Sequence, residues 1–252
     1  GLGSTTLVKA MREGDWEIVE GAFFTEWSAK RHVLRPVELP KWWNRFRAGD
    51  WGSAKPYAFH WFAIVSDDWQ HPDGKIIPRG ALIAYRELYG VKLKPDGGFE
   101  PDTGVKEPAD VVARKVLAME GAEFNESGKM TRKPTEEISY GVLDPAAFAT
   151  VSGPSIAETM AREGARFRGA DNKRVANEGA IGGHDQFRKR LVGDPEGRPL
   201  LYFFANCVHS IRTIPVLQHD QHRPEDIDTH MEDHLYDSAR YGCMSRPYIN
   251  TK

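Results

Sequence analysis

The order of strand-like and helix-like segments is the feature that most restricts how this chain can fold. Residues 45–68 hold two apolar stretches separated by a Gly/Ser/Pro turn, a pattern typical of a β-hairpin. Residues 81–90 predict a third strand, so the first three strands form a meander. Helix and strand patterns then alternate to the end of the chain. This order predicts an α/β fold: a mixed sheet, built from a three-stranded meander plus parallel strands, with helices on both faces.

The later elements carry clear start and stop signals. The amphipathic pattern at 107–121 predicts a helix that ends at Gly121, and Pro145 stops the strand expected at 137–145. The remaining pattern predicts, in order, a helix at 155–164, a short strand near Phe167, a long helix over about 173–192, a strand at 197–206 and closing helices.

Composition limits the classes of function. The chain has 252 residues, 40% hydrophobic and 28% charged, which is enough apolar material for a substantial core. The formal net charge is −2, so no overall basic field indicates nucleic acid, and any DNA contact must come from a local patch. Cys207 and Cys243 form no CxxC motif, which favours a reducing compartment. Because no long apolar run or charged-then-apolar leader is present, we expect neither a membrane span nor a secretory signal.

The chain divides into two parts of unequal size. Residues 1–45 predict a connecting arm, with room for a short helix in 7–24 and an extended, proline-punctuated course up to Trp42 and Trp43. Residues 46–252 predict the main domain. Exposed aromatic side chains often mark interfaces, so the arm also fits a docking role.

Closely spaced His and Asp residues stand near the carboxyl end, in residues 229–243. Thr229 and Glu232 form a capping-box pattern, which predicts a helix that begins at His230. One polar stripe of that helix would hold His230, His234, Asp237 and Tyr241. A neighbouring face of apolar and small residues would hold Met231, Leu235, Ser238 and Gly242. We therefore expect one face to pack closely and the other to present ligands.

Three carboxylates are candidates for a metal site. Asp50 and Asp144 follow the first and fourth strands, and they share one edge of the sheet if these strands are parallel neighbours. Asp237, on the polar stripe, would complete the group. Close carboxylates repel one another and raise one another's pKa values, so a divalent cation is the natural neutraliser. Oxygen-rich sites select Mg²⁺ or Mn²⁺, and two such ions about 4 Å apart can stabilise the attacking and leaving oxygens of a phosphodiester.

A zinc site is the competing interpretation of the late helix. His230 and His234 have the i, i+4 spacing of zinc hydrolases. Met231 stands where the HExxH motif has Glu, and Asp233 stands where the HxxEH motif has Glu. Nothing nearby clearly supplies a third nitrogen or sulfur ligand. Zinc is therefore the weaker hypothesis, and it predicts that zinc restores activity to stripped protein.

Four motifs together resemble a known family. They are GDWEIVEGAFF (14–24), WNRFRAGDWGSAKP (43–56), YGVLDPAAF (140–148) and RPEDIDTHMEDHLYDSARYGCM (223–244), of which the last is the most specific. The chain resembles, over essentially its whole length, the nuclease domain of the large terminase subunit of tailed bacteriophages. The resemblance implies a ribonuclease-H-like fold. It also implies that Asp50, Asp144 and Asp237 bind metal and are catalytic, with His234 close to the metal.

The same resemblance implies a function and its partners. The activity would be a Mg²⁺- or Mn²⁺-dependent endonuclease that cleaves concatemeric double-stranded DNA during genome packaging, in the cytoplasm of the bacterial host. ATP hydrolysis belongs to a preceding domain in this family, so residues 1–45 would be the arm from an absent ATPase domain. The SGKMT stretch at 127–131 lacks the first Gly of a phosphate loop, so no nucleotide site is expected. The ATPase domain, the small terminase subunit and the capsid portal are the implied protein partners.

Several alternatives stay open at this stage. Asp50 and Asp144 also fit turn or capping chemistry. A different ribonuclease-H-like nuclease, such as a junction resolvase or exonuclease, or a non-catalytic module that docks on the portal or motor, would fit the same pattern. Lys55, five residues after Asp50, is the best candidate for a phosphate contact. Two further basic groups are by default solvated surface, with phosphate contact as the functional alternative: Lys129, Arg132 and Lys133, and Arg166, Arg168, Lys173 and Arg174.

Overall fold

A seven-stranded mixed sheet runs through the middle of the protein. The computed structural model describes residues 21–150, 153–176 and 181–248. The sheet strands are β1 (Val33–Leu34), β2 (Arg45–Asp50), β3 (Ala58–Ile64), β6 (Leu82–Tyr89), β11 (Tyr140–Leu143), β12 (Arg168–Gly169) and β13 (Leu201–Phe204). Their order across the sheet is β1-β13-β6-β3-β2-β11-β12.

The remaining elements surround this sheet. Three small hairpins pair β4 (Trp69–Gln70) with β5 (Ile76–Ile77), β7 (Val91–Leu93) with β8 (Phe99–Gly104), and β9 (Glu123–Phe124) with β10 (Met130–Arg132). The helices are α2 (Ala29–His32), α3 (Ala109–Met119), α4 (Ile156–Arg162), α5 (Gly183–Val192), α6 (Val208–Thr213) and α7 (His234–Ser245), with two short 3₁₀ turns, η1 (Pro145–Phe148) and η2 (Ile214–Val216). Within the described ranges, none of the helices has the length and apolarity needed to cross a membrane.

The strand pairing confirms the predicted meander and its parallel additions. β2 pairs antiparallel with β3, and β3 pairs antiparallel with β6. β11 then adds in parallel beside β2, in a register that runs from Tyr140 opposite Phe46 to Leu143 opposite Gly49. The backbone amide of Asp144 continues this ladder by donating to the carbonyl of Gly49 at 3.0 Å. The carboxyl ends of β2 and β11 therefore lie together at one edge of the sheet.

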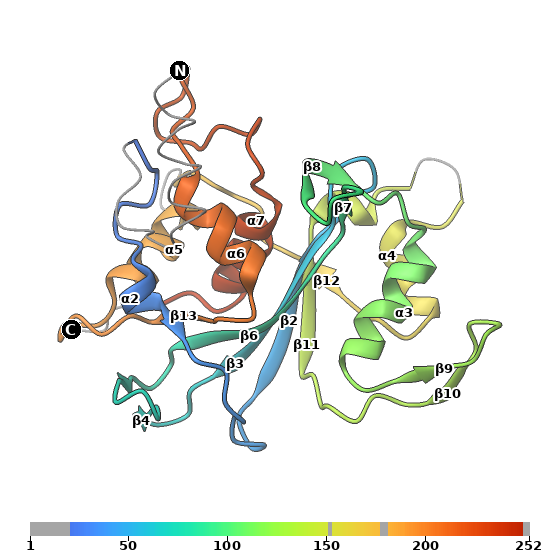
Figure 1. The fold of residues 1–252 in the computed structure, drawn as a ribbon, viewed down its shortest axis with the longest axis horizontal. Helices are drawn as coiled ribbons and strands as arrows, with labels where there is room; N and C mark the ends of the chain where they lie inside the picture. Colours follow the sequence, from blue (N-terminus) through green and yellow to red (C-terminus); the bar gives the residue numbers. More distant parts are fainter. Residues whose placement is uncertain (1–20, 151–152, 177–180, 249–252) are drawn as a thin grey trace.

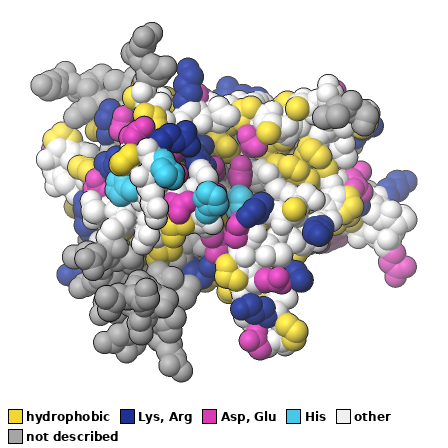
Figure 2. Space-filling model, turned by 90° about the horizontal axis from the view of Figure 1, so that it is seen from above, with side chains coloured by type: hydrophobic (Ala, Val, Ile, Leu, Met, Phe, Trp, Pro, Cys, Tyr) yellow, Lys and Arg dark blue, Asp and Glu magenta, His cyan; other side chains and the backbone are white. Residues whose placement is uncertain are grey.

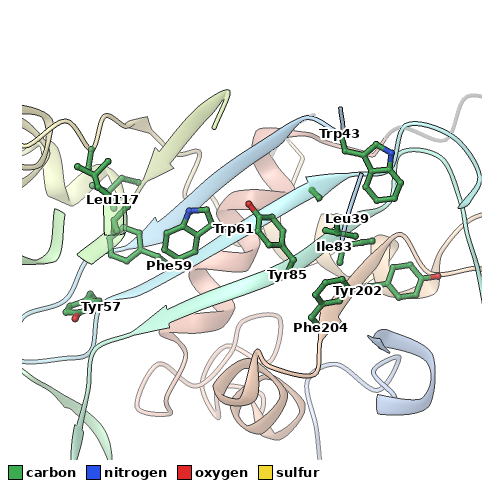
Figure 3. Packing of buried hydrophobic residues seen from close by; sticks show 14 of the residues in the cluster. Leu39, Trp43, Tyr57, Phe59, Trp61, Ile83, Tyr85, Leu117, Tyr202 and Phe204 are labelled. Carbon is green, nitrogen blue, oxygen red and sulfur yellow. The ribbon is translucent and has the colours of Figure 1, made fainter. Parts of the chain in front are cut away.

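Helices cover both faces of the sheet, as predicted (Figure 1). Helices α5, α6 and α7 lie against one face, and α3 and α4 lie against the other. Side chains of β3 alternate between them: Phe59 and Trp61 belong to the core beneath α3 and α4 (Figure 3), whereas Phe62 belongs to the core beneath α5 and α7. This alternation is the period-2 pattern of a strand that is buried on both faces.

The described part of the amino-terminal arm is packed into the domain. Phe24 and Trp27 belong to the core beneath α5 and α7, and β1 adds to the sheet edge in parallel with β13. Trp43 is buried while Trp42 is 78% exposed, so only one of the two tryptophans is available to a partner. The helix expected in 7–24 lies almost wholly outside the described residues. The connection of this arm to an ATPase domain stays a prediction.

Two predicted helix starts are wrong. The long helix expected over 173–192 begins only at Gly183, and residues 173–176 form an irregular segment in front of it. The late helix begins at His234 instead of His230. Its capping box does not form because the Glu232 carboxylate accepts hydrogen bonds from Arg212 at 2.7 and 2.8 Å and from the Tyr89 hydroxyl at 2.8 Å. A partly buried ion pair with Arg212, together with the Tyr89 hydrogen bond, outweighs a cap worth about 1 kcal/mol.

The small residues of α7 let it lie directly on the sheet. The Ser238 hydroxyl donates to the carbonyl of Ala48 at 3.0 Å, so α7 bonds the backbone of β2. A Cβ at Gly242 would lie 2.6 Å from Cε2 of the buried Phe62 ring. The predicted close-packing face is therefore confirmed for Ser238 and Gly242. These two contacts set how closely α7 lies against the sheet.

We expect Gly242→Ala to destabilise the protein by about 1 kcal/mol. Overpacking a well-filled core costs about 1–3 kcal/mol, whereas Ala gains about 1 kcal/mol over Gly in helix propensity. The clash with Phe62 should win because a buried ring has no free space to enter. Urea unfolding of both proteins measures the difference. A more stable Gly242→Ala variant would show that α7 does not press on β3 in this way.

Candidate metal centre

The three predicted carboxylates meet at the carboxyl edge of β2 and β11. Asp50 is the last residue of β2, Asp144 directly follows β11, and Asp237 stands in the first turn of α7. Asp50 and Asp237 are each only 7% exposed, and Asp144 is half-buried. Their charges act on one another: Asp237 raises the pKa of both Asp50 and Asp144, and Asp144 raises that of Asp50. The structure thus brings together three carboxylates that are far apart in the sequence.

Asp50 is the most strongly perturbed member of the group. Burial, together with the negative charges of Asp237 and Asp144, raises the pKa of its carboxyl to about 7, against the opposing effect of His234. Burial is also the main reason that the pKa of Asp144 is raised. The Asp144 Oδ1 atom accepts from the amide of Ala146 at 3.2 Å, which caps η1. Asp144 therefore does cap η1, and its carboxylate still lies at the shared edge of the sheet.

His234 links Asp50 to a fourth acid, Asp102. Its Nδ1 atom lies 3.1 Å from Asp50 Oδ2, and its Nε2 atom lies 3.0 Å from Asp102 Oδ1. Ionised carboxylates only accept hydrogen bonds, so both ring nitrogens carry protons when both acids are ionised. Burial alone would lower the pKa of His234, but the surrounding acids Asp50, Asp233 and Asp237 outweigh it and raise that pKa. The imidazolium therefore offsets part of the negative charge.

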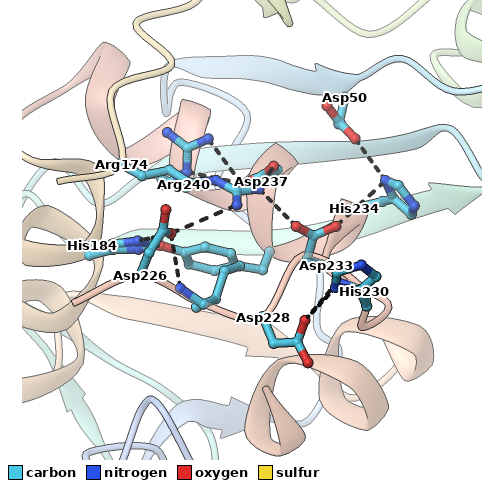
Figure 4. A network of polar contacts seen from close by, with 12 residues as sticks. Asp50, Arg174, His184, Asp226, Asp228, His230, Asp233, His234, Asp237 and Arg240 are labelled. Carbon is cyan, nitrogen blue, oxygen red and sulfur yellow. Dashed lines mark hydrogen bonds and ion pairs between the residues drawn. The ribbon is translucent and has the colours of Figure 1, made fainter. Parts of the chain in front are cut away.

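Two arginines hold Asp237 (Figure 4). Its Oδ1 atom accepts from Arg240 Nε and Nη2 at 3.0 and 2.9 Å, and its Oδ2 atom accepts from Arg174 Nη2 at 2.5 Å. Arg174 Nη2 also donates to Asp233 at 2.7 Å. Burial would raise the pKa of Asp237, but Arg240 and Arg174 hold it below its ordinary value. Asp237 is therefore ionised, and each of its two oxygens accepts from an arginine.

Comparisons with known proteins place this arrangement in a fold family. No protein-family model matches the sequence, and no curated protein matches it. The nuclease domain of the large terminase of P22 superposes with a TM-score of 0.56 at 16% identity, over 90% of this chain and 93% of that domain. The large terminase of a thermophilic bacteriophage superposes with a TM-score of 0.58 at 12% identity, over 88% of this chain and 44% of the terminase. This chain has a terminase-nuclease fold. That fold is ribonuclease-H-like, as the sequence resemblance implied, and the chain spans less than half the length of the thermophilic phage's protein.

The donor chemistry of this terminase-nuclease fold suits a divalent cation. Three buried or half-buried carboxylates whose charges repel one another, with an imidazole beside them, form the oxygen-rich set that Mg²⁺ and Mn²⁺ prefer. As the side chains stand, however, no group of three or more His, Cys, Asp or Glu among the described residues is arranged to hold a metal ion. Both oxygens of Asp237 accept hydrogen bonds from arginines in this arrangement.

The zinc interpretation finds no support in the geometry. His230 stands outside α7, its side chain is 93% exposed, and it contacts Asp228. His234 is directed at Asp50 and Asp102 instead. The two histidines share no helix face, so the i, i+4 ligand pair does not exist.

Three residues of the site were missed by sequence reasoning. Asp102 lies on β8, in a positive-φ conformation that non-glycine residues rarely adopt, and no signal in the sequence marks it. Arg240 follows Asp237 by three residues on a helix, a spacing that does predict an ion pair. Arg174 was assigned to a solvated basic surface, and this is wrong, because the residue is bound to Asp233 and Asp237. Lys55 forms an ion pair with Asp102 beside the site, and its contact with DNA stays a prediction.

The outer surface of this region mixes charges of both signs. Seen from above, His side chains lie among acidic and basic ones on this face (Figure 2). Lys55 is one of the basic groups near the site, with a side chain 58% exposed. Basic side chains on this face therefore lie among acidic ones and form no uniformly basic surface.

Proposed function

We propose that this protein is a divalent-metal-dependent endonuclease that cleaves concatemeric double-stranded viral DNA during genome packaging. The observation that carries the proposal is the meeting of Asp50, Asp144 and Asp237 at one edge of a terminase-nuclease fold. The P22 domain, which this chain matches over nearly the whole of both, is a nuclease by name. Acids that repel one another in a buried site suit a cation more than any other ligand.

The proposed roles follow from what each side chain touches. Asp50, Asp144 and Asp237 would hold one or two Mg²⁺ or Mn²⁺ ions, with His234 beside them. Such ions, when bound, supply Lewis acidity that lowers the pKa of water and offsets charge on the phosphate, so no protein nucleophile is required. His234 holds the Oδ2 atom of Asp50 through its Nδ1 proton, and Asp102 fixes the ring from the other side. His234 and Asp102 together therefore orient the Asp50 carboxylate.

The proposed partners follow from the same family likeness. Double-stranded DNA is the substrate, with Lys55 as the candidate phosphate contact, and sequence preference should be weak because backbone contacts carry no base information. The large terminase of the thermophilic bacteriophage is a longer chain that was solved with ATP-γ-S, and an ATPase domain of the same large terminase is the partner we propose for this chain. We also propose the small terminase subunit and the capsid portal as protein partners. The proposed location is the cytoplasm of the bacterial host.

A plasmid-cleavage assay tests this function directly. Supercoiled plasmid should be nicked or linearised in Mn²⁺ or Mg²⁺ and left intact in EDTA. Asp144→Ala should lower the rate by roughly a hundredfold or more, since losing a few kcal/mol of transition-state stabilisation costs a factor of ten per 1.4 kcal/mol. Asp185→Ala removes an exposed acid of α5 and is the matched control, expected to cut like the wild type.

The outcomes separate the rival functions. A strong preference for branched DNA or for free ends would favour a junction resolvase or an exonuclease. Tight portal binding without metal-dependent cleavage would favour a docking module, for which the exposed Trp42 is a candidate contact. Equal cleavage by wild type and Asp144→Ala would exclude the proposed carboxylate chemistry.

A further inference from the structure

The two arginines that hold Asp237 are not equivalent. Arg240 has a side chain only 1% exposed, donates twice to Asp237 Oδ1, and lies over the ring of Tyr241 at 4.6 Å. Arg174 has a side chain 19% exposed and reaches Asp237 Oδ2 from the solvent side. Arg240 is therefore the more deeply buried of the two arginines, and Arg174 is the one whose side chain reaches solvent.

The backbone of Arg174 is fixed even though its side chain is not. The amide of Gly183 donates to the carbonyl of Lys173, and the amide of His184 donates to the carbonyl of Arg174, both at 2.9 Å. A Cβ at Gly183 would lie 2.7 Å from the Lys173 carbonyl oxygen, so only glycine permits this approach. The start of α5 thus holds the irregular segment in a position that delivers the Arg174 guanidinium to Asp237.

A third carboxylate lies within reach of the same guanidinium. Arg174 Nη1 is 3.8 Å from Asp226 Oδ1, and Nη2 already contacts Asp233 as well as Asp237. If the bond to Asp237 breaks, the guanidinium can shift toward Asp226 and Asp233 without losing all of its carboxylate partners. Such a movement would free Asp237 Oδ2 while Arg174 keeps Asp233 as a partner.

Arg174 and a divalent cation would compete for the negative charge of Asp237. An arginine cannot lose its proton in a protein, so its positive charge leaves Asp237 only when the side chain moves. A divalent ion at Asp237 would add its two positive charges beside Arg174 and Arg240, and Arg174 has the more exposed side chain of these two arginines. We propose that Arg174 is an internal cation that occupies Asp237 in place of a divalent ion, so that metal binds there only by displacing the Arg174 side chain. This inference rests on the proposed function, and it makes Arg174 the residue that sets the metal affinity of the site.

Mn²⁺ binding in the absence of DNA tests this displacement. Free Mn²⁺ is measured by electron paramagnetic resonance in titrations of wild type, Arg174→Gln and Lys173→Gln. Arg174→Gln removes the competing charge and should lower the Mn²⁺ dissociation constant about tenfold or more. Lys173→Gln removes the same charge from the neighbouring exposed residue and should leave the constant within about twofold. An Arg174→Gln protein that binds Mn²⁺ no more tightly than Lys173→Gln overturns the inference.

A measurement on the wild type keeps the test independent of the variant's folding. Phenylglyoxal modifies accessible arginines, and peptide mass spectrometry gives the rate at Arg174. Displacement predicts faster modification of Arg174 with saturating Mn²⁺ than with EDTA, while Arg240 stays unmodified in both. Slower or unchanged modification of Arg174 counts against displacement.

Asp50→Asn separates failure of this inference from failure of the proposed function. If wild-type protein binds Mn²⁺ and Asp50→Asn does not, the metal site exists, and equal affinities of wild type and Arg174→Gln then reject only the role of Arg174. If Mn²⁺ binding to wild type and Arg174→Gln does not depend on Asp50, the proposed metal site and the inference fall together.

Discussion

Replacing Asp50 with Asn is expected to lower metal-dependent DNA cleavage by roughly a thousandfold without weakening the fold. Asn has nearly the shape of Asp but carries no charge, and the several kcal/mol of charge stabilisation that a carboxylate-held cation contributes correspond to about three orders of magnitude in rate. Stability should be equal or higher at neutral pH. Burial and the charges of Asp237 and Asp144 raise the pKa of Asp50, which means that its ionised form is disfavoured in the folded protein.

Two measurements check this result together. Cleavage rates come from the plasmid assay at saturating Mn²⁺, and the free energy of unfolding comes from urea titration of the same preparations without metal. Asp185→Asn, on the exposed side of α5, is the control for the loss of one negative charge. Cleavage by Asp50→Asn within tenfold of wild type would contradict the proposed function. A large loss of stability would instead show that the hydrogen bond between Asp50 and His234 holds the edge together.

The fold was predictable because local sequence signals and long-range pairing agree. The hairpin around residues 51–57 and the meander need only strand periodicity and turn residues. The alternation of helices and strands predicts parallel strands but not which strand lies beside β2, and it is the observed pairing of β2 with β11 that puts Asp50 and Asp144 at one edge. The sequence therefore predicted a shared edge for these two carboxylates on the condition that the two strands are parallel neighbours, and the structure supplies that pairing.

The charge compensation of the site was not predictable in the same way. Arg174 reaches Asp237 from an irregular segment sixty-three residues earlier, and nothing local to either residue marks that contact. Asp102 depends on how a small hairpin lies over the edge. The start of α7 was misjudged because the capping preference of Thr229 is weaker than the tertiary ion pair of Glu232 with Arg212. Local rules failed where distant charged groups decide the free energy.

These contacts change how the acidic cluster should be understood. From the sequence, a divalent cation is the expected neutraliser of three repelling carboxylates. The structure shows that the protein supplies neutralising charge of its own, from His234 at Asp50 and from Arg174 and Arg240 at Asp237. Asp144 has no such ion pair among the described residues, since its side chain accepts only from the backbone of Ala146. The three acids should therefore differ sharply in how much the fold depends on them.

Asp237→Asn is accordingly expected to destabilise the fold, in contrast to Asp50→Asn. The Asn side chain has a single acceptor oxygen, so it cannot serve both Arg240 at Oδ1 and Arg174 at Oδ2. Breaking a buried ion pair from one side costs about 3–5 kcal/mol because the partner charge stays buried. Arg174 retains Asp233, whereas Arg240 is almost fully buried and keeps only the 3.3 Å bond to the carbonyl of Lys173. The lower figure, about 3 kcal/mol, is therefore expected.

Thermal unfolding without metal measures this loss, and Asp144→Asn is the matched control. For a chain of this size about 3 kcal/mol lowers the Tm by roughly 6–12 °C. Asp144→Asn makes the same chemical change at a half-buried acid, and Asn caps a helix start as well as Asp does, so its Tm should stay within about 2 °C of wild type. If Asp237→Asn is as stable as Asp144→Asn, the two arginines do not depend on Asp237. Asp237 would then be free to bind a cation without competition, and the displacement of Arg174 would have no energetic basis.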